Sequence, residues 1–192
     1  RVIYRDDLPT DATNVFFRIL LFKLFNKIET WTALEQSFGE LTWETYDFRA
    51  YDRLLSARMA DSIRIYSAAY IMPSAGSAFG HKLKHQNHLR LIEALIDRGY
   101  PSLASDCAAM SDLYDLLLRA PSIGRFLAYQ FATDLNYSRL TNFDESEFVV
   151  AGPGALDGIE KCFVGARSVE PEDVIHYMYE NQHRHFSEEG ID

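Results

Sequence analysis

The segment that decides the fold is TNVFFRILLFKLFNK, residues 13–27. Its apolar residues recur at helical spacing and form a stripe broader than the apolar face of an ordinary surface helix. Thr13 is the expected N-cap of a helix over Asn14 to Lys27. A stripe of this width predicts a central, largely buried helix. Its members are Val15, Phe16, Ile19, Leu20 and Leu24.

Helical periodicity continues through most of the remaining chain, and no series of alternating apolar and polar residues predicts a sheet. Glycine and proline interrupt the pattern at Gly39, Pro73, Gly99 and Pro121. The sequence therefore predicts an all-α protein folded as a multi-helix bundle. Further helices are expected over residues 30–39, 43–59, 63–71, 81–98, 102–110, 112–119, 123–135, 155–163 and 171–186.

The composition is that of a globular domain. The chain has 192 residues, of which 47% are apolar, and only two cysteines, so neither disulfides nor a structural metal are needed for stability. No stretch resembles a signal peptide or a membrane span. We expect a single helical domain over residues 1–192, without membrane partners, in the cytoplasm or in a eukaryotic nucleus. Because the first residue is Arg1, we also expect the chain to be a segment of a longer protein.

The net charge is −9, from 28 acidic and 19 basic residues. A chain with this charge has no overall basic field to attract nucleic acid. Any contact with DNA must therefore come from local basic patches and from the backbone amides at helix starts.

The most informative motif is LLRAPSIGRFLA, residues 117–128. A helix, a proline-containing turn and a glycine at the start of a second helix form the pattern of a helix-hairpin-helix. The first amides of the second helix lack intrahelical partners, so they can bind a DNA phosphate with help from Gly124 and Arg125. The alternative is an ordinary turn between two helices.

A second glycine-rich turn, Gly152-Pro153-Gly154, precedes the helix expected over 155–163. Glycines allow a backbone to approach a phosphate closely, so Gly152 and Gly154 are further candidate phosphate contacts. No GK[ST] follows, which argues against a nucleoside triphosphate site. The alternative is a plain turn that starts a helix.

Asp134 stands at the end of the expected helix over 123–135, just before Asn136 and Tyr137. A carboxylate here can stabilise a developing cation or accept a proton, and a helix-terminal role is the alternative. Glu145 and Glu147 follow in the loop, and Glu147 is a candidate second carboxylate.

The stretch HKLKHQNHLR, residues 81–90, is the one clearly cationic part of the sequence. Lys84 is a candidate phosphate contact there. The histidine spacing fits a helix face, but no acidic or cysteine ligand accompanies it, so no metal site and no cofactor are predicted. On the first helix, Arg18 lies one turn after Asn14 and needs either an internal carboxylate or a ligand phosphate. Tyr129 and Tyr137 are candidates for stacking on a base.

Several short motifs occur in an order that resembles a known family. They are TNVFFR (13–18), IYSAAY (65–70), GRFLAYQ (124–130), DLNY (134–137) and GPGA (152–155). Together they resemble the helical domain associated with 5-hydroxymethyluracil DNA kinases. That group includes the α-glutamyl/putrescinyl-thymine pyrophosphorylases, which are regarded as amino-acid:DNA transferases. The resemblance covers residues 3–163.

The resemblance implies a fold related to the helix-hairpin-helix DNA glycosylases and action on a modified pyrimidine that is flipped out of DNA. Glycosylases of that fold that also cut the strand have a lysine two residues after the last hairpin glycine. This chain has Phe126 at that place, which disfavours lyase chemistry. The glycosylase aspartate falls further along than Asp134, near Asp144, Glu145 and Glu147, but Asp134 lies within the family-like DLNY motif and is ranked first.

The leading hypothesis is therefore a DNA base hypermodification enzyme that transfers an amine or amino acid to an activated, flipped 5-substituted pyrimidine. Its partners would be DNA with modified pyrimidines and a kinase that acts on the same base. Asp134, Glu147 and Asn136 are the candidate catalytic residues. The alternatives are a monofunctional glycosylase that excises a modified pyrimidine, and a non-catalytic DNA-binding module attached to a kinase.

Overall fold

The computed structural model describes residues 7–68 and 72–191, and within these ranges the secondary structure is helical with no strand. The prediction of an all-α bundle is confirmed. The helices are α1 (Ala12–Phe25), α2 (Ile28–Phe38), α3 (Phe48–Ala60), α4 (Gly76–Phe79), α5 (Lys84–Asp97), α6 (Tyr100–Ser105), α7 (Met110–Leu118), α8 (Arg125–Asn136), α9 (Pro153–Cys162) and α10 (Pro171–Glu188), with a short 3₁₀ turn, η1, at Ala166–Ser168.

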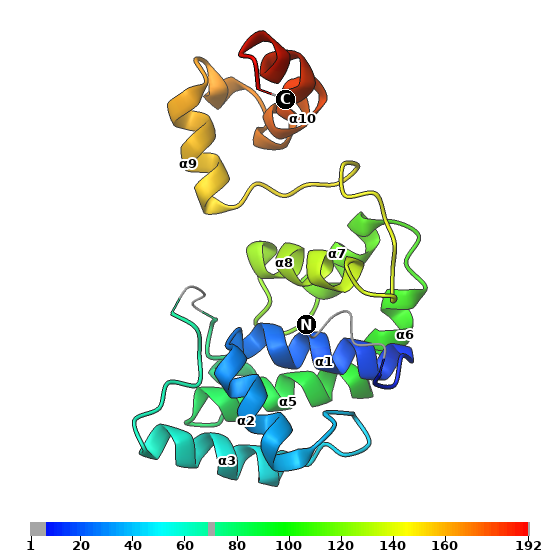
Figure 1. Ribbon diagram of the computed structural model, residues 1–192, viewed down its shortest axis with the longest axis vertical. Helices are drawn as coiled ribbons and strands as arrows, with labels where there is room; N and C mark the ends of the chain where they lie inside the picture. The colour runs from blue at the N-terminus through cyan, green and yellow to red at the C-terminus, as the bar shows by residue number, and fades with distance from the viewer. Residues whose placement is uncertain (1–6, 69–71, 192) are drawn as a thin grey trace.

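Helix α1 is the centre of the bundle, as its sequence predicts. It lies between α5 on one side and the α7–α8 pair on the other, and α3 packs against α5 (Figure 1). The predicted apolar stripe is buried throughout, with Phe16 and Leu20 at 0% exposure. Asp11 rather than Thr13 caps α1, because the Asp11 carboxylate accepts the N–H of Asn14 at 3.1 Å.

Helix α3 begins at Phe48, five residues later than predicted. The residues before it are held in a turn, in which Thr42 and Thr45 bond each other at 3.1 Å. Asp47 then accepts the N–H of Ala50 at 2.7 Å and starts the helix as its N-cap. Side-chain bonds to the backbone thus override the apolar periodicity of residues 43–47.

The helix predicted over 63–71 is wrong for its described part. Residues 63–68 run without helix across the bundle, and residues 69–71 lie outside the described residues. Two contacts replace the helical hydrogen bonds. The backbone C=O of Ile65 accepts the Thr30 hydroxyl at 2.8 Å, and the N–H of Ser67 donates to the C=O of Phe25 at 3.0 Å. These partners come from α1 and α2, so sequence periodicity cannot reveal them.

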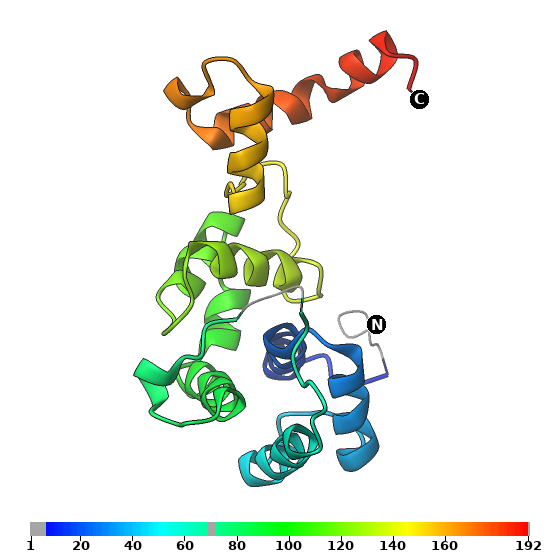
Figure 2. The same ribbon diagram turned by 90° about the vertical axis from the view of Figure 1, so that its left-hand side faces the viewer.

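Helices α9 and α10 lie at one end of the molecule, beyond the α7–α8 pair (Figures 1 and 2). They pack on each other and bury few side chains, chiefly Ile159 and Val174. An apolar groove of about 690 Å³ runs between them. No helix in the described ranges is both long enough and apolar enough to cross a membrane.

Candidate functional site

The predicted turn between two helices is present between α7 and α8. Ser122 takes a positive φ of 64°, and Gly124 is the N-cap of α8. Gly124 and Arg125 are both exposed, and a Cβ added to Gly124 would meet no atom within 4 Å. The start of α8 has no side-chain cap and has an exposed arginine beside it, which is an arrangement that favours an anion.

The structure brings the second glycine turn to the first. A Cβ added to Gly152, the N-cap of α9, would approach the Phe126 ring to 3.2 Å, so the starts of α8 and α9 are neighbours. Gly154 is exposed and has open space around it. One anion already lies at this entry, because the Glu172 carboxylate accepts the N–H of Ala151 at 2.9 Å.

Asp134 is partly buried and forms an ion pair with Lys23 of α1. Lys23 Nζ lies 2.8 Å from Asp134 Oδ2, and the side chains are 10% and 21% exposed respectively. The pair links α1 to α8 and keeps a positive group next to the carboxylate. Asp134 retains a solvent-accessible edge, so it is neither sealed in the core nor fully exposed.

Asn136 holds the loop that follows α8. Its Oδ1 accepts the N–H of Phe143 at 2.7 Å and the hydroxyl of Thr141 at 3.2 Å, while its Nδ2 donates to the C=O of Phe143 at 3.0 Å. The side chain is 8% exposed. These hydrogen bonds give Asn136 a structural role, because they fix the loop to the end of α8.

Replacing Asn136 with alanine is expected to lower the free energy of unfolding by about 2 kcal/mol, since buried groups of the loop lose their partners. Urea denaturation measures the change. Asn181→Ala is the matched control, because its amide donates to the C=O of Tyr177 of its own helix, and a shift within about 0.5 kcal/mol is expected there. Equal stability of Asn136→Ala and the wild type would contradict the anchoring role.

The loop after α8 also contacts the two candidate stacking tyrosines. The hydroxyl of Tyr137 donates to Glu145 at 3.1 Å, and its ring is 45% exposed. Tyr129 packs edge-on against Phe148 at 6.1 Å, and burial, helped by Glu145, raises the pKa of Tyr129. Glu147 is exposed. Tyr137 is thus the more accessible of the two rings.

Asn14 and Arg18 lie inside the bundle. Asn14 is 1% exposed; its Oδ1 accepts the N–H of Trp43 at 2.8 Å and its Nδ2 donates to Glu44 at 3.1 Å. Arg18 is 2% exposed, on the central helix. In this structure Arg18 is an interior residue rather than a surface contact for a phosphate.

Lys84 is the first residue of α5 and stands over the Tyr66 ring, with Nζ 4.5 Å from the ring centroid. Phe25 stacks on Tyr66 at 5.0 Å. The Tyr66 hydroxyl donates to His88 Nδ1 at 3.0 Å, because His88 Nε2 donates to the C=O of Pro73 at 2.8 Å. Burial lowers the pKa of His88 to about 4, so this imidazole is neutral at pH 7.

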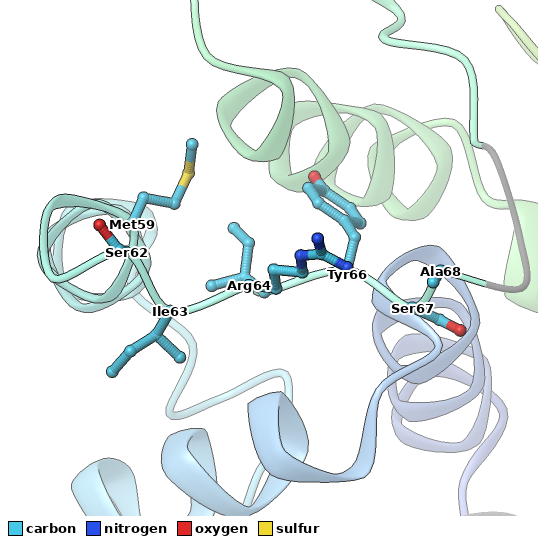
Figure 3. A pocket seen from close by; sticks show the side chains of 8 residues that line it. Met59, Ser62, Ile63, Arg64, Tyr66, Ser67 and Ala68 are labelled. Atoms are coloured by element: carbon cyan, nitrogen blue, oxygen red, sulfur yellow. The ribbon is translucent and has the colours of Figure 1, made fainter.

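Tyr66 also lines a hollow of about 430 Å³, formed along the segment that follows α3 (Figure 3). Its other lining residues include Ser62, Arg64 and Ser67. In Figure 3, Met59 and Tyr66 project to one side of this segment and Ile63 to the other, while Arg64 extends in the direction of Tyr66. The hollow therefore combines hydroxyl groups, an arginine and apolar surface.

A serine, a histidine and an aspartate also meet between α3 and α5. His85 Nε2 lies 2.7 Å from Asp52 and 3.2 Å from the Ser56 hydroxyl. A catalytic triad needs serine and aspartate on opposite imidazole nitrogens, whereas both bond Nε2 here. His85 is 0% exposed, and the cluster joins two helices. Among the described residues, no group of three or more His, Cys, Asp or Glu side chains is arranged to hold a metal ion.

Comparison with known proteins agrees with these motifs. All of residues 1–192 match the family described as "5-hmdU DNA kinase, helical domain". The chain belongs to this family. A curated relative, "5-hmdU DNA kinase" of Bacillus phage SP10, is 26% identical over 172 residues, covering 82% of the chain and 26% of the relative. The chain thus spans about a quarter of that relative's length. No solved structure matches the chain significantly.

This member of the 5-hmdU DNA kinase helical-domain family has site residues that sequence reasoning missed. Lys23 lies in an apolar helix where a charge needs a partner, the same signal that singled out Arg18. Arg64 and Tyr66 were hidden by the wrong helix prediction over 63–71, although Tyr66 lies within the family-like IYSAAY motif.

Proposed function

We propose that this helical domain binds DNA that carries a 5-substituted pyrimidine and transfers an amine or amino acid to that base after it has been phosphorylated. The observation that carries the proposal is the contact between the starts of α8 and α9 at Phe126 and Gly152. The starts of α8 and α9 are therefore neighbours, and Arg125 beside them is exposed. Such a pair can hold the phosphates of a bent strand while a base is flipped out.

Family membership supports the same proposal. The relative's name specifies a kinase that acts on 5-hmdU in DNA. A kinase partner, or a kinase region of the same polypeptide, would convert the 5-hydroxymethyl group into a phosphate ester, which is a better leaving group than hydroxide. The predicted relation to helix-hairpin-helix glycosylases fits base flipping and is part of this proposal.

In the proposed reaction, the nitrogen lone pair of the amine forms a bond to the methylene carbon attached to C5. The C–O bond to the phosphate breaks, and its electron pair leaves with the phosphate. Asp134 accepts the proton that the amine loses. Lys23 Nζ lies 2.8 Å from Asp134 Oδ2 and positions this carboxylate at the end of α8.

The test uses duplexes that contain 5-hydroxymethyluracil or its phosphate or pyrophosphate ester, incubated with the protein and a mixture of amino acids and polyamines. Mass spectrometry after digestion to nucleosides identifies the products. A new amine adduct is expected. Asp134→Asn should lower its rate at least about 100-fold and leave DNA binding intact.

Asp115→Asn is the matched control, because Asp115 is exposed on α7. The control should retain the wild-type rate. Release of a free base together with an abasic site would show that the protein is a glycosylase and would exclude the transferase. Adduct formation that is equally fast with Asp134→Asn would exclude Asp134 as the base.

A second candidate function is a non-catalytic module that docks DNA beside a kinase. The ion pair between Asp134 and Lys23 favours it, because a paired carboxylate that bridges two helices also has a purely structural explanation. This function predicts salt-dependent DNA binding without any change in the nucleosides.

A further inference from the structure

One cation lines the hollow at Tyr66, and a second stands over the ring of Tyr66. Arg64 is exposed and lines the hollow, and Lys84 stands on the ring of Tyr66, which also lines it. Within residues 7–68 and 72–191, neither Arg64 nor Lys84 forms a hydrogen bond or an ion pair. Although the chain has 28 acidic residues, no carboxylate of the described part of the chain lies within ion-pair distance of either cation.

The Lys84 ammonium is held in place by its surroundings. Burial lowers the pKa of Lys84 below its ordinary value, because the ammonium group loses contact with water. Its contact with the ring supplies only a modest cation–π attraction. Lys84 is also the first residue of the 14-residue α5, whose N-terminus has no side-chain cap. An anion bound here would meet the lysine and the positive end of the helix.

The Tyr66 ring is itself fixed from several directions. Phe25 stacks on it at an interplanar angle of 19°, Lys84 lies over it, and its hydroxyl bonds His88. With these contacts already made, Tyr66 acts as a rigid support for Lys84 and presents no free face for stacking on a base. The apolar surface of the hollow comes instead from Met59, Ile63 and Ile65.

We propose that this hollow binds a phosphate group carried by a pyrimidine, with Arg64 and Lys84 contacting the phosphate and the apolar wall contacting the ring. Its volume of about 430 Å³ lies within the range of small-molecule sites, about 300–1,000 Å³. Ser62 also lines the same hollow. The inference rests on the proposed function, because it names the phosphorylated base as the ligand of this site.

Binding of matched fluorescent oligonucleotides tests the proposal. Three single strands of the same sequence carry one thymine, one 5-hydroxymethyluracil or one 5-hydroxymethyluracil phosphate ester. The wild type should bind the ester at least about tenfold more tightly than the other two strands. Arg64→Gln and Lys84→Met should each reduce this preference by about tenfold, which is the lower end of the effect of losing one charge-assisted hydrogen bond.

Arg53→Gln is the matched control, because Arg53 is exposed on α3 and does not line the hollow. It should leave the preference unchanged. If the wild type has no preference for the ester, the proposal is wrong. If Arg64→Gln weakens binding of all three strands equally, the arginine contacts the DNA backbone, and the proposal is again overturned.

The outcome can be separated from that of the transferase test. A preference for the ester without adduct formation retains the phosphate site and rejects the transferase. Adduct formation without the preference rejects the hollow as the site of the phosphate. Inorganic phosphate and pyrophosphate should compete with the ester-carrying strand for the protein. If they displace only the strands that lack the ester, the proposal is also contradicted.

Discussion

Replacing Phe16 with alanine is expected to lower the free energy of unfolding by about 3–5 kcal/mol. Phe16 is 0% exposed on α1, the helix that contacts α5, α6 and α8 at once. Its loss removes apolar burial and leaves a cavity that neighbouring helices cannot all close together, because moving toward one opens a gap at another. Thermal and urea denaturation of the purified variant measure the change.

Phe186→Ala is the matched control for this prediction. Phe186 lies on α10 and is 48% exposed, so its truncation should change stability by less than about 1 kcal/mol. Comparable losses in the two variants would mean that α1 is not the centre of the cooperative core.

Lowering the pH from 6.5 to 4 is expected to remove about 3 kcal/mol of stability through His88. Burial lowers the pKa of His88 from 6.5 to about 4, so the folded protein keeps the imidazole neutral over this range. The unfolded chain binds a proton as soon as the pH falls below 6.5. The contribution of His88 is therefore complete above pH 6.5 and is lost progressively as the pH falls to about 4.

The His88→Gln variant tests this assignment, because a glutamine amide can donate to the C=O of Pro73 and accept from the Tyr66 hydroxyl without titrating. Its stability should be nearly flat between pH 6.5 and 4.5, whereas the wild type loses up to about 1.4 kcal/mol per pH unit. Equal slopes in urea titrations of the two proteins would show that His88 is not the responsible group. The pKa values of Asp11 and Asp52 are lowered from 3.8, so their contributions to stability are lost only at more acidic pH.

Much of the bundle follows from local sequence. The breadth of the apolar stripe on residues 13–27 predicts the buried central helix, and Gly99 and Pro121 mark boundaries that the structure retains. The turn before α8 was also predictable, and α9 begins at Pro153, two residues before the predicted start at Ala155, since proline and glycine restrict the backbone locally.

The site was less predictable, because its geometry depends on contacts between distant residues. The pairing of Lys23 with Asp134 joins α1 to α8, and the path of residues 63–68 depends on hydrogen bonds to Thr30 and Phe25. A periodic pattern reports only which face of a segment is apolar. It does not report which partner satisfies a lysine or a backbone amide.

By itself, the sequence determined the helical class, the burial of α1 and the family-like motifs, because each depends on residues within one or two turns of each other. The tertiary structure decided where the charges lie. It placed Arg18 and His88 in the interior, paired Asp134 with Lys23, and left Arg64 and Lys84 beside a hollow without carboxylates. Electrostatic environment depends on distances through space, and folding sets those distances.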